Sequence, residues 1–350
     1  MMNIAIKTVL LNWYADNKRD LPWRRTKDPY SIWVSEIILQ QTRVVYGMEY
    51  FRRFMECFPT VTALARARED EVMRIWQGLG YYRRAAYMHL AAKVIAEHYN
   101  GIFPNTYARV GALPGVGSYT AAAICSIAYN LPYAVVDGNV YRILARLFAI
   151  ELPIDSIAGK RYFAELADSL LDKENAGDYN QAIMDFGAMQ CVPQSPQCRV
   201  CPFAGRCAAF LHNKVDVYPV KKKKTEVKNR YFNYLRISCG SKILLRKRTE
   251  RDIWQNLYEF PMIESPHQMD YDALATTAEF CRLTKGATRI ELKKKVPMAK
   301  HQLSHQTIYA VFYELETDNL PQPQGTIAVE ECNLQDYAKS RLIENYLNSL

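Results

Sequence analysis

The chain has 350 residues, of which 49% are hydrophobic, and its formal net charge is +9. This length accommodates about two domains with buried cores, and the composition excludes a disordered or fibrous protein. No apolar run approaches the roughly 20 residues of a membrane helix, and the N-terminus lacks a signal-peptide pattern. We therefore expect a cytoplasmic protein with no membrane partner, and the positive charge favours a polyanion as the partner.

Residues 1–212 have the pattern of an all-α region. Apolar residues recur at intervals of three and four in Ile32–Ile37, Val72–Trp76 and Ala121–Ala128. Short turn signals such as Pro59 and Asn100–Gly101 separate these segments. No stretch in this half alternates steadily between apolar and polar residues, so the sequence predicts helices without a sheet.

Glu36 lies among apolar residues in the stretch Trp33-Val-Ser-Glu-Ile-Ile-Leu-Gln-Gln-Thr-Arg43. A carboxyl group in apolar surroundings is costly unless it is protonated or paired, so we expect its pKa to be raised. A raised pKa suits a general acid. The alternative is a solvent-facing glutamate on an amphipathic helix.

The stretch Leu113-Pro-Gly-Val-Gly-Ser-Tyr-Thr-Ala121 predicts a helix–hairpin–helix. Gly115 and Gly117 allow a tight turn and the close approach of another backbone. Leu113 and Val116 are expected to pack the two helices together. The second helix opens with exposed N–H groups, which can bind DNA phosphates without reading the sequence. A plain connector between two helices remains the alternative.

Asp137 stands before a predicted helix in Val135-Val-Asp-Gly-Asn-Val-Tyr-Arg142. An aspartate at this place can cap the helix by accepting its first N–H groups. The stretch alone leaves open whether Asp137 does more than cap.

Four cysteines lie within seventeen residues, with the spacing Cys191-x6-Cys198-x2-Cys201-x5-Cys207. Four thiolates on one proline-containing loop can hold a metal centre that stabilises an otherwise irregular segment. Structural zinc sites usually contain two pairs with two-residue spacing, and only one such pair occurs here. The spacing therefore favours a [4Fe-4S] cluster, with zinc as the alternative.

Residues 213–230 read as a basic, solvated linker. Seven lysines and arginines face only two acidic residues between Lys214 and Arg230, a net +5 of the chain's +9. After it, Tyr234–Ser238 and Lys242–Arg246 resemble a hairpin, and Thr307–Leu315 resembles a strand. Helices are predicted over Ala273–Cys281 and Leu334–Leu350. Residues 231–350 are thus expected to form a second, α+β domain.

Together these motifs resemble the endonuclease III, or helix–hairpin–helix, superfamily of base-excision glycosylases. Within it, the Glu36 segment with Gln40–Thr42, and Leu21-Pro-Trp-Arg24 before it, resemble adenine DNA glycosylases of the MutY type. The resemblance covers essentially the whole chain. It implies a six-helix barrel module at about 22–131. It also implies an iron–sulfur module built from the N-terminal helix and about 132–212, and a NUDIX-like domain at 231–350.

The resemblance also implies roles in a base-flipping reaction. Glu36 would protonate the flipped adenine, Asp137 would stabilise the developing sugar cation, and Asn139 would orient Asp137 or the water. Relatives that also cut the DNA backbone carry a lysine where this chain has Tyr119. A tyrosine cannot form the Schiff base of those enzymes, so we expect a monofunctional glycosylase with Tyr119 lining the pocket. A structural role for Tyr119 is the alternative.

Further residues are assigned by matching the family. Gln41 and Tyr81, the latter in Gly78-Leu-Gly-Tyr-Tyr-Arg83, match side chains that wedge into the base stack. Taken alone, Tyr81 reads as an ordinary helix-surface or core aromatic. Arg24 and Gln181 match positions near the adenine.

The C-terminal region resembles the NUDIX-like domain with which these enzymes recognise 8-oxoguanine. Trp254-Gln-Asn-Leu-Tyr-Glu-Phe-Pro261 fits that family, whereas the glutamate-rich pyrophosphatase signature is missing. In the loop His301-Gln-Leu-Ser-His305, Leu303 replaces the usual Phe, and Ser304 and His305 retain hydrogen-bonding groups. Without the family resemblance, Ser304 and His305 would be interpreted as ordinary turn residues.

The expected partner is double-stranded DNA that contains adenine opposite 8-oxoguanine or guanine, bound by a monomer in a bacterial cytoplasm. Two other functions compete with this one. A sister glycosylase that removes thymine opposite guanine could also carry a hairpin tyrosine, but it would not need residues 231–350. A non-catalytic iron–sulfur DNA-binding protein would explain the hairpin and the cysteines, but not the two acids.

Overall fold

The computed structural model describes residues 2–222 and 227–350. Its contacts divide the chain into two compact units, and each is described here by itself. Unit 1 comprises Met1–Arg66 and Tyr87–Lys224, and unit 2 comprises Ala67–Ala86 and Thr225–Leu350. None of the helices in the described ranges is long and apolar enough to cross a membrane.

Unit 1 is built from helices, as predicted. Their bounds are α1 Met2–Asn17, η1 Pro22–Arg24, α2 Pro29–Leu39, α3 Val44–Cys57, α4 Val61–Arg66, α6 Arg83–His98 (which begins in unit 2), α7 Tyr107–Gly111, α8 Ser118–Tyr129, α9 Gly138–Leu147, α10 Ile157–Leu170, α11 Ala176–Met189, η2 Cys198–Val200 and α12 Ala208–Leu211.

Helix α2 shows how local sequence fixes these elements. Asp28 caps it by accepting the N–H groups of Tyr30 and Ser31, and Pro29 occupies its first position. Nine of its eleven residues are buried, so the helix runs through the core and presents no polar face to water. Its Trp33 is fully buried and meets the ring of Phe103 edge-on.

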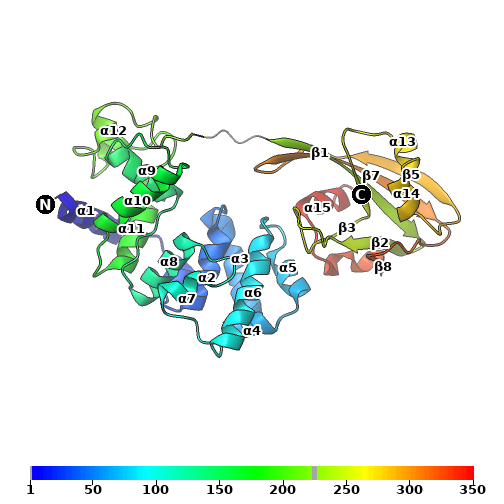
Figure 1. Ribbon diagram of the computed structural model, residues 1–350, viewed down its shortest axis with the longest axis horizontal. Helices are drawn as coiled ribbons and strands as arrows, with labels where there is room; N and C mark the ends of the chain where they lie inside the picture. Colours follow the sequence, from blue (N-terminus) through cyan, green and yellow to red (C-terminus); the bar gives the residue numbers. More distant parts are fainter. Residues whose placement is uncertain (1, 223–226) are drawn as a thin grey trace. The chain divides into compact units, whose positions relative to one another are not determined.

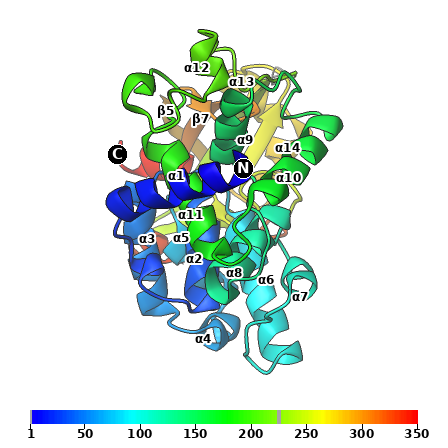
Figure 2. The same ribbon diagram turned by 90° about the vertical axis from the view of Figure 1, so that its left-hand side faces the viewer.

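Helix α11 joins the parts of unit 1 that carry the candidate site. It packs against α1, α8 and α9, and Figure 2 shows α1 crossing it. Its Phe186 contacts Trp13 of α1 and Phe203 of the cysteine loop, with ring centroids 5.0 and 5.3 Å apart. Because α11 contacts both the helical core and the cysteine loop, it fixes the position of one relative to the other within unit 1.

Unit 2 contains an 8-stranded mixed sheet whose main order is β3-β2-β1-β7-β5. The bounds are β1 Lys228–Cys239, β2 Lys242–Lys247, β3 Tyr258–Glu259, β4 Met262–Ser265, β5 Ile290–Pro297, β6 His301–Gln302, β7 Gln306–Thr317 and β8 Thr326–Glu330. The predicted hairpin is present, with Cys239 opposite Lys242. The long strands β1 and β7 pair in parallel, from Lys228 opposite Gln306 to Ser238 opposite Glu316.

Both faces of this sheet are covered. One face packs with α15 (Arg341–Leu347), where Phe312 of β7 stacks on Tyr346 at 3.9 Å. The other face packs with α13 (Tyr271–Ala275) and α14 (Ala278–Leu283) (Figure 1). An α+β fold with helices on both faces of a mixed sheet confirms the predicted class.

Two helices predicted in this half are shorter than expected. The helix predicted over Ala273–Cys281 is interrupted, because Thr277 accepts the N–H of Phe280 and caps α14 separately from α13. The helix predicted over Leu334–Leu350 is split in the same way. A 3-10 helix, η3 (Glu331–Asp336), comes first, and Ser340 then caps α15 by accepting the N–H of Ile343.

The solvated linker predicted over 213–230 is also shorter than expected. Tyr218 is buried and its carbonyl accepts from the guanidinium of Arg146, while Val220 accepts the N–H of Ile154. Strand β1 already begins at Lys228. The first part of the predicted linker therefore packs on the helical unit, through the buried Tyr218 and the carbonyl of Val220. The predicted linker residues Lys223, Lys224 and Glu226 lie outside the described residues.

A segment from the first half of the chain belongs to unit 2 by its contacts. It contains α5 (Glu69–Trp76), whose Asp70 accepts from Lys247 at 2.7 Å. The side-chain oxygen of Gln77 accepts the N–H of Lys339 at 3.0 Å, and Tyr82 donates to the carbonyl of Lys339 at 3.2 Å. Polar contacts thus join this segment to the C-terminal region.

Candidate active site

The first component of the site is the buried carboxyl group of Glu36 on α2. Only 9% of this residue is exposed, and Tyr119 of α8 donates a hydrogen bond to its Oε2 at 2.9 Å. Burial raises the pKa of Glu36 to about 7, and the Tyr119 hydrogen bond opposes this rise only in part. The group therefore exchanges a proton near neutral pH, in the direction predicted from its apolar neighbours.

Asp137 is the second acid and is held in a different way. It caps α9, with Oδ1 accepting the N–H groups of Asn139 at 2.9 Å and Val140 at 2.8 Å. Its Oδ2 accepts from the Asn139 side chain at 2.8 Å. Burial raises the pKa of Asp137, while the bonds from Val140 and Asn139 work in the opposite direction. The capping interpretation is correct, and the same contacts stabilise a carboxylate.

A chain of hydrogen bonds leads from Asp137 to the cysteine loop. The side-chain oxygen of Asn139 accepts from Arg142 at 2.8 Å, and Arg142 donates onward to the carbonyls of Cys191 and Gly187, each at 2.7 Å. Arg142 is buried, with 8% exposure. The position of Asp137 is therefore coupled to the first residue of the loop.

Arg24 lies on η1, which packs against α2, the helix that carries Glu36. Burial is the main influence on the pKa of Glu36, and the positive charge of Arg24 opposes it by lowering that pKa. Its guanidinium donates to Asp185 of α11, with one of the bonds at 2.7 Å. Arg19 donates to the same carboxylate at 2.9 Å through Nε. Gln181, the other residue predicted near the substrate, is buried on α11 one turn before Asp185.

The predicted hairpin is formed by α7, a turn and α8. Leu113 and Val116 are buried in it, as expected. Gly115 has φ +76°, and a Cβ there would stand 2.5 Å from the Cβ of Tyr87, so a larger residue does not fit. A Cβ on Gly117 would meet no atom of the described chain within 4 Å. Space therefore remains before the N–H groups that open α8.

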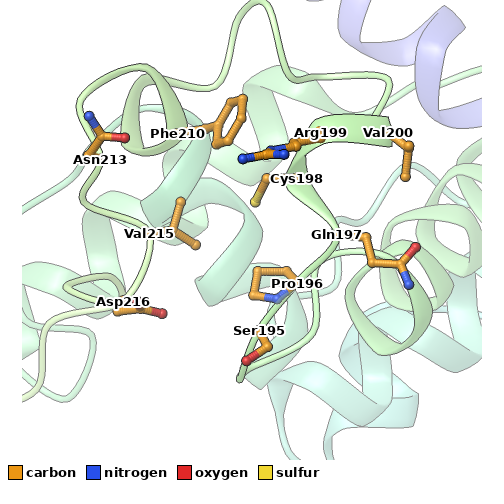
Figure 3. Close-up of a pocket in the computed structure, with 10 residues that line it drawn as sticks. All are labelled: Ser195, Pro196, Gln197, Cys198, Arg199, Val200, Phe210, Asn213, Val215 and Asp216. Carbon is orange, nitrogen blue, oxygen red and sulfur yellow. The ribbon is translucent and has the colours of Figure 1, made fainter.

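The four cysteines follow α11 on one irregular loop. Cys191 comes just after the helix, Cys198 begins η2, and Cys207 precedes α12. A cavity of about 600 Å³ adjoins Cys198, and Figure 3 shows its lining side chains on the loop and on the segment from Asn213 to Asp216. In the described ranges, no group of three or more His, Cys, Asp or Glu side chains is arranged to hold a metal ion.

Arg146 of α9 holds this loop through several hydrogen bonds. It is 3% exposed and donates to the carbonyls of Val192 at 2.7 Å and Pro193 at 2.9 Å. It also donates to the sulfur of Cys191 at 3.5 Å, and its own carbonyl accepts from the thiol of Cys207 at 3.4 Å. One buried guanidinium thus fixes the path of the loop and places a positive charge beside a sulfur.

The two predicted wedge residues share an unusual backbone conformation. Gln41 has φ +57° and Tyr81 has φ +48°, a region that non-glycine residues seldom adopt. Both are exposed, Tyr81 to 49%. Such a conformation costs free energy unless the surrounding structure holds it.

In unit 2, the loop Leu303–His305 joins β6 to β7. Leu303 packs against the core on the α15 face, whereas Ser304 and His305 are exposed. The hydroxyl groups of Ser304 and Tyr81 lie 2.6 Å apart in a hydrogen bond. Unit 2 thus brings together two residues that were predicted separately, 223 positions apart in the sequence.

The sequence did not reveal Asp185, Arg19, Arg142 or Arg146. Asp185 is a single acid between apolar residues of α11, the same signal that identified Glu36. The buried arginines carried no such signal, because an arginine on a helix usually faces water.

Comparison with known proteins gives two family matches. Residues 34–165 match the HhH-GPD superfamily of base excision DNA repair proteins, and residues 233–349 match the NUDIX domain. An adenine DNA glycosylase of Buchnera aphidicola subsp. Acyrthosiphon pisum is 35% identical over 269 residues, which cover 77% of each chain.

Two solved structures resemble the helical part. A thermostable thymine-DNA glycosylase superposes with a TM-score of 0.56 and 27% identity, covering 60% of this chain and 97% of the other. Endonuclease III in a non-covalent DNA complex superposes with a TM-score of 0.52 and 22% identity, covering 60% and 95%. At that identity the second likeness concerns the fold alone.

The raised pKa of Glu36 predicts a pH-dependent cost in stability. Below pH 4.5 Glu36 is protonated in both states. Between pH 4.5 and 7 only the folded state keeps the proton, so the free energy of unfolding falls as pH rises. Glu36→Gln removes this cost. Relative to the unsubstituted protein, the variant should gain about 2–3 kcal/mol between pH 5 and 8.

Urea denaturation at several pH values measures this difference. Glu165→Gln, which removes an exposed carboxylate from α10, controls for the loss of one negative charge. A stability difference for Glu36→Gln that does not change with pH would contradict a raised pKa.

Proposed function

Because the chain belongs to the adenine DNA glycosylases of base excision repair, we propose that it hydrolyses the bond between sugar and adenine where adenine is mispaired with 8-oxoguanine or guanine. The observation that carries this proposal is the pair of differently held acids, Glu36 and Asp137. Glu36 is buried and titrates near neutral pH, and Asp137 is surrounded by donors.

In the proposed reaction, Glu36 gives its proton to N7 of the flipped adenine. The bond between the sugar and N9 then breaks, and its electron pair leaves with the base. Tyr119 supports this step by holding the Glu36 carboxyl group through its hydroxyl at 2.9 Å. A pKa near the working pH suits a group that must be protonated before the reaction and donate during it.

Asp137 is proposed to stabilise the positive charge that develops on the sugar. Two backbone N–H groups and the Asn139 side chain favour its ionised form, which is the form that a cation requires. Because Asn139 is itself held by Arg142, the carboxylate is oriented before the substrate binds. Water then adds to the sugar carbon and gives up a proton to the Glu36 carboxylate, which completes hydrolysis and restores the acid.

Tyr119 supports a monofunctional reaction. The residue is partly buried, its hydroxyl contacts Glu36 and Met184, and its phenol carries no amine that could form a Schiff base with the sugar. Burial also raises the pKa of Tyr119, so the phenol stays neutral and remains a hydrogen-bond donor. The proposed product is an intact strand with an abasic site.

Recognition of 8-oxoguanine is proposed for Tyr81 and Ser304. The hydrogen bond between their hydroxyls, at 2.6 Å, holds the exposed tyrosine ring and leaves the serine hydroxyl a further hydrogen-bonding position. His305 is exposed beside it. Oxidised guanine differs from guanine in its pattern of donors and acceptors, so polar groups at this place could distinguish the two.

A [4Fe-4S] cluster is proposed for Cys191, Cys198, Cys201 and Cys207, to stabilise the loop and shape it for DNA phosphates. All four belong to one loop, and Arg146 and Phe203 donate to two of the sulfurs. Structural zinc sites usually contain two pairs of cysteines with two-residue spacing, and here only Cys198 and Cys201 have that spacing. The spacing therefore supports a four-iron cluster over a single zinc ion.

The reaction can be tested with a labelled duplex that contains one adenine opposite 8-oxoguanine. Strand breaks should appear only after alkali, and Glu36→Gln should lower the single-turnover rate by about 10²- to 10⁴-fold. A duplex with thymine opposite guanine should remain uncut. Breaks without alkali would contradict the monofunctional reaction, and cleavage of the thymine duplex alone would assign the chain to the sister activity.

Ser304→Ala should reduce the preference for adenine opposite 8-oxoguanine over adenine opposite guanine. The expected loss is about two- to tenfold, because one hydrogen bond contributes about 0.5–1.5 kcal/mol. Tyr81→Phe keeps the ring and removes the partner hydroxyl, so it should act in the same direction. Ser241→Ala, an exposed position at the other end of β1, is the matched control. Equal preference in Ser304→Ala and the control would remove Ser304 from recognition.

The cluster can be tested by metal and sulfide analysis of the purified protein. We expect about four irons and about four inorganic sulfides per chain. Cys198→Ser should lower the iron content, whereas Cys239→Ser, outside the loop, should leave it unchanged. About one zinc per chain without sulfide would replace the cluster by a structural zinc site.

A further inference from the structure

Asp185 is a completely buried carboxylate shared by two arginines. It lies on α11 with 0% exposure. Its Oδ1 accepts from Nε of Arg19 at 2.9 Å and from Arg24 at 2.7 Å, and Oδ2 accepts a second, shorter bond from Arg24. Burial raises the pKa of Asp185, but the bonds from Arg24 and Arg19 outweigh it and keep the group ionised.

Arg24 connects this carboxylate to Glu36. Its side chain is 13% exposed, and its guanidinium lies over the ring of Tyr14, 5.8 Å from the centroid. It also donates to the carbonyl of Arg19 at 3.3 Å. Two bonds to Asp185 fix the plane of the guanidinium, because a carboxylate and a guanidinium match in a fork geometry. A flexible arginine thus becomes a fixed charge on an element that packs against α2.

The charges around Glu36 come from several helices. Asp137 at the start of α9 raises the pKa of Glu36, whereas the Tyr119 hydrogen bond from α8 and the charge of Arg24 lower it. Asp185 of α11 and Tyr14 of α1 face Arg24. The field that Glu36 experiences from Arg24 therefore depends on how far Asp185 neutralises that arginine.

We propose that Asp185 is a positioning residue for adenine excision: it fixes the orientation of the Arg24 guanidinium, on an element that packs against the helix of Glu36, and offsets its charge. This inference rests on the proposed function, because it assumes that Glu36 acts as the general acid. Arg19 completes the arrangement as the second donor to Asp185.

Asp185→Asn tests the proposal through the pH dependence of single-turnover excision. The amide leaves Arg24 and Arg19 without a negative partner, so the pKa of Glu36 should fall and the basic limb of the profile should move down by about one pH unit. The rate at pH 8 should then fall about tenfold more than the rate at pH 5. A merely structural role would lower the rate equally at every pH.

Arg24→Gln provides the opposite test. Removing the positive charge should raise the pKa of Glu36 and move the basic limb to higher pH, even if the maximal rate falls. Opposite shifts in the two variants support the proposal, and shifts in the same direction, or none in Asp185→Asn, overturn it. If Asp185→Asn does not fold, the pH profile of Arg24→Gln decides alone, and a basic limb that does not move in this variant overturns the proposal.

Asp20→Asn is the matched control. Asp20 also pairs with an arginine, Arg25, but both side chains are exposed, to 71% and 69%. The profile of this variant should coincide with that of the unsubstituted protein. The unsubstituted protein's activity on adenine opposite 8-oxoguanine decides the proposed function separately. If that activity is absent, carbon-13 NMR of the Glu36 carboxyl group still measures the shifts in the variants.

Discussion

Two carboxyl groups, Glu36 buried and Asp137 partly buried, constrain the rest of the helical unit. A buried carboxylate is unfavourable unless protonation or hydrogen bonds compensate it, and a second acid nearby increases the cost. The chain resolves this in two ways. Glu36 accepts a hydrogen bond from Tyr119 and titrates near neutral pH, whereas Asp137 accepts two of the N–H groups that open α9. This difference in donors is the basis on which a proton-donating role is proposed for Glu36 and a charge-stabilising role for Asp137.

These donors are themselves held by buried charges. The side-chain amide of Asn139 donates to Asp137 through its nitrogen and accepts from Arg142 through its oxygen. Arg142 also donates to the carbonyl of Cys191. Arg146 then fixes the same loop one turn further along α9. A buried arginine has five N–H donors to satisfy, and irregular loop carbonyls supply acceptors that a regular helix does not. Hydrogen bonds of Arg142 and Arg146 therefore connect the cysteine loop to the site of the two acids. These bonds do not involve a ligand of the sulfurs.

The sequence predicted what depends on near neighbours. Apolar spacing identified α2, α5 and α8, a capping aspartate identified the start of α9, and apolar neighbours identified the burial of Glu36. It also predicted the hairpin of β1 and β2. It did not predict contacts between distant residues, such as Arg24 with Asp185, 161 positions apart, or the parallel pairing of β1 with β7. The capped breaks after α13 and before α15 were missed, because Thr277 and Ser340 also fit the interior of a helix.

The segment Ala67–Ala86 shows that a family boundary and a folding boundary need not coincide. It lies inside the match to the HhH-GPD superfamily, yet its contacts place it in the same unit as the NUDIX match. The carboxylates of Glu69 and Asp70 open α5, where the helix dipole favours negative charge, and there they meet Asn256 and Lys247.

These polar contacts are the reason that Tyr81 depends on the C-terminal region. The strained backbone of Tyr81 needs surrounding structure to hold it, and the Ser304 hydroxyl is part of that structure. The ring proposed to wedge into DNA is therefore held by the residue proposed to recognise the base opposite adenine. Removing the C-terminal region would also release Tyr81, which belongs by sequence to the glycosylase half. The proposed excision and the proposed recognition of the opposite base therefore depend on overlapping parts of this chain.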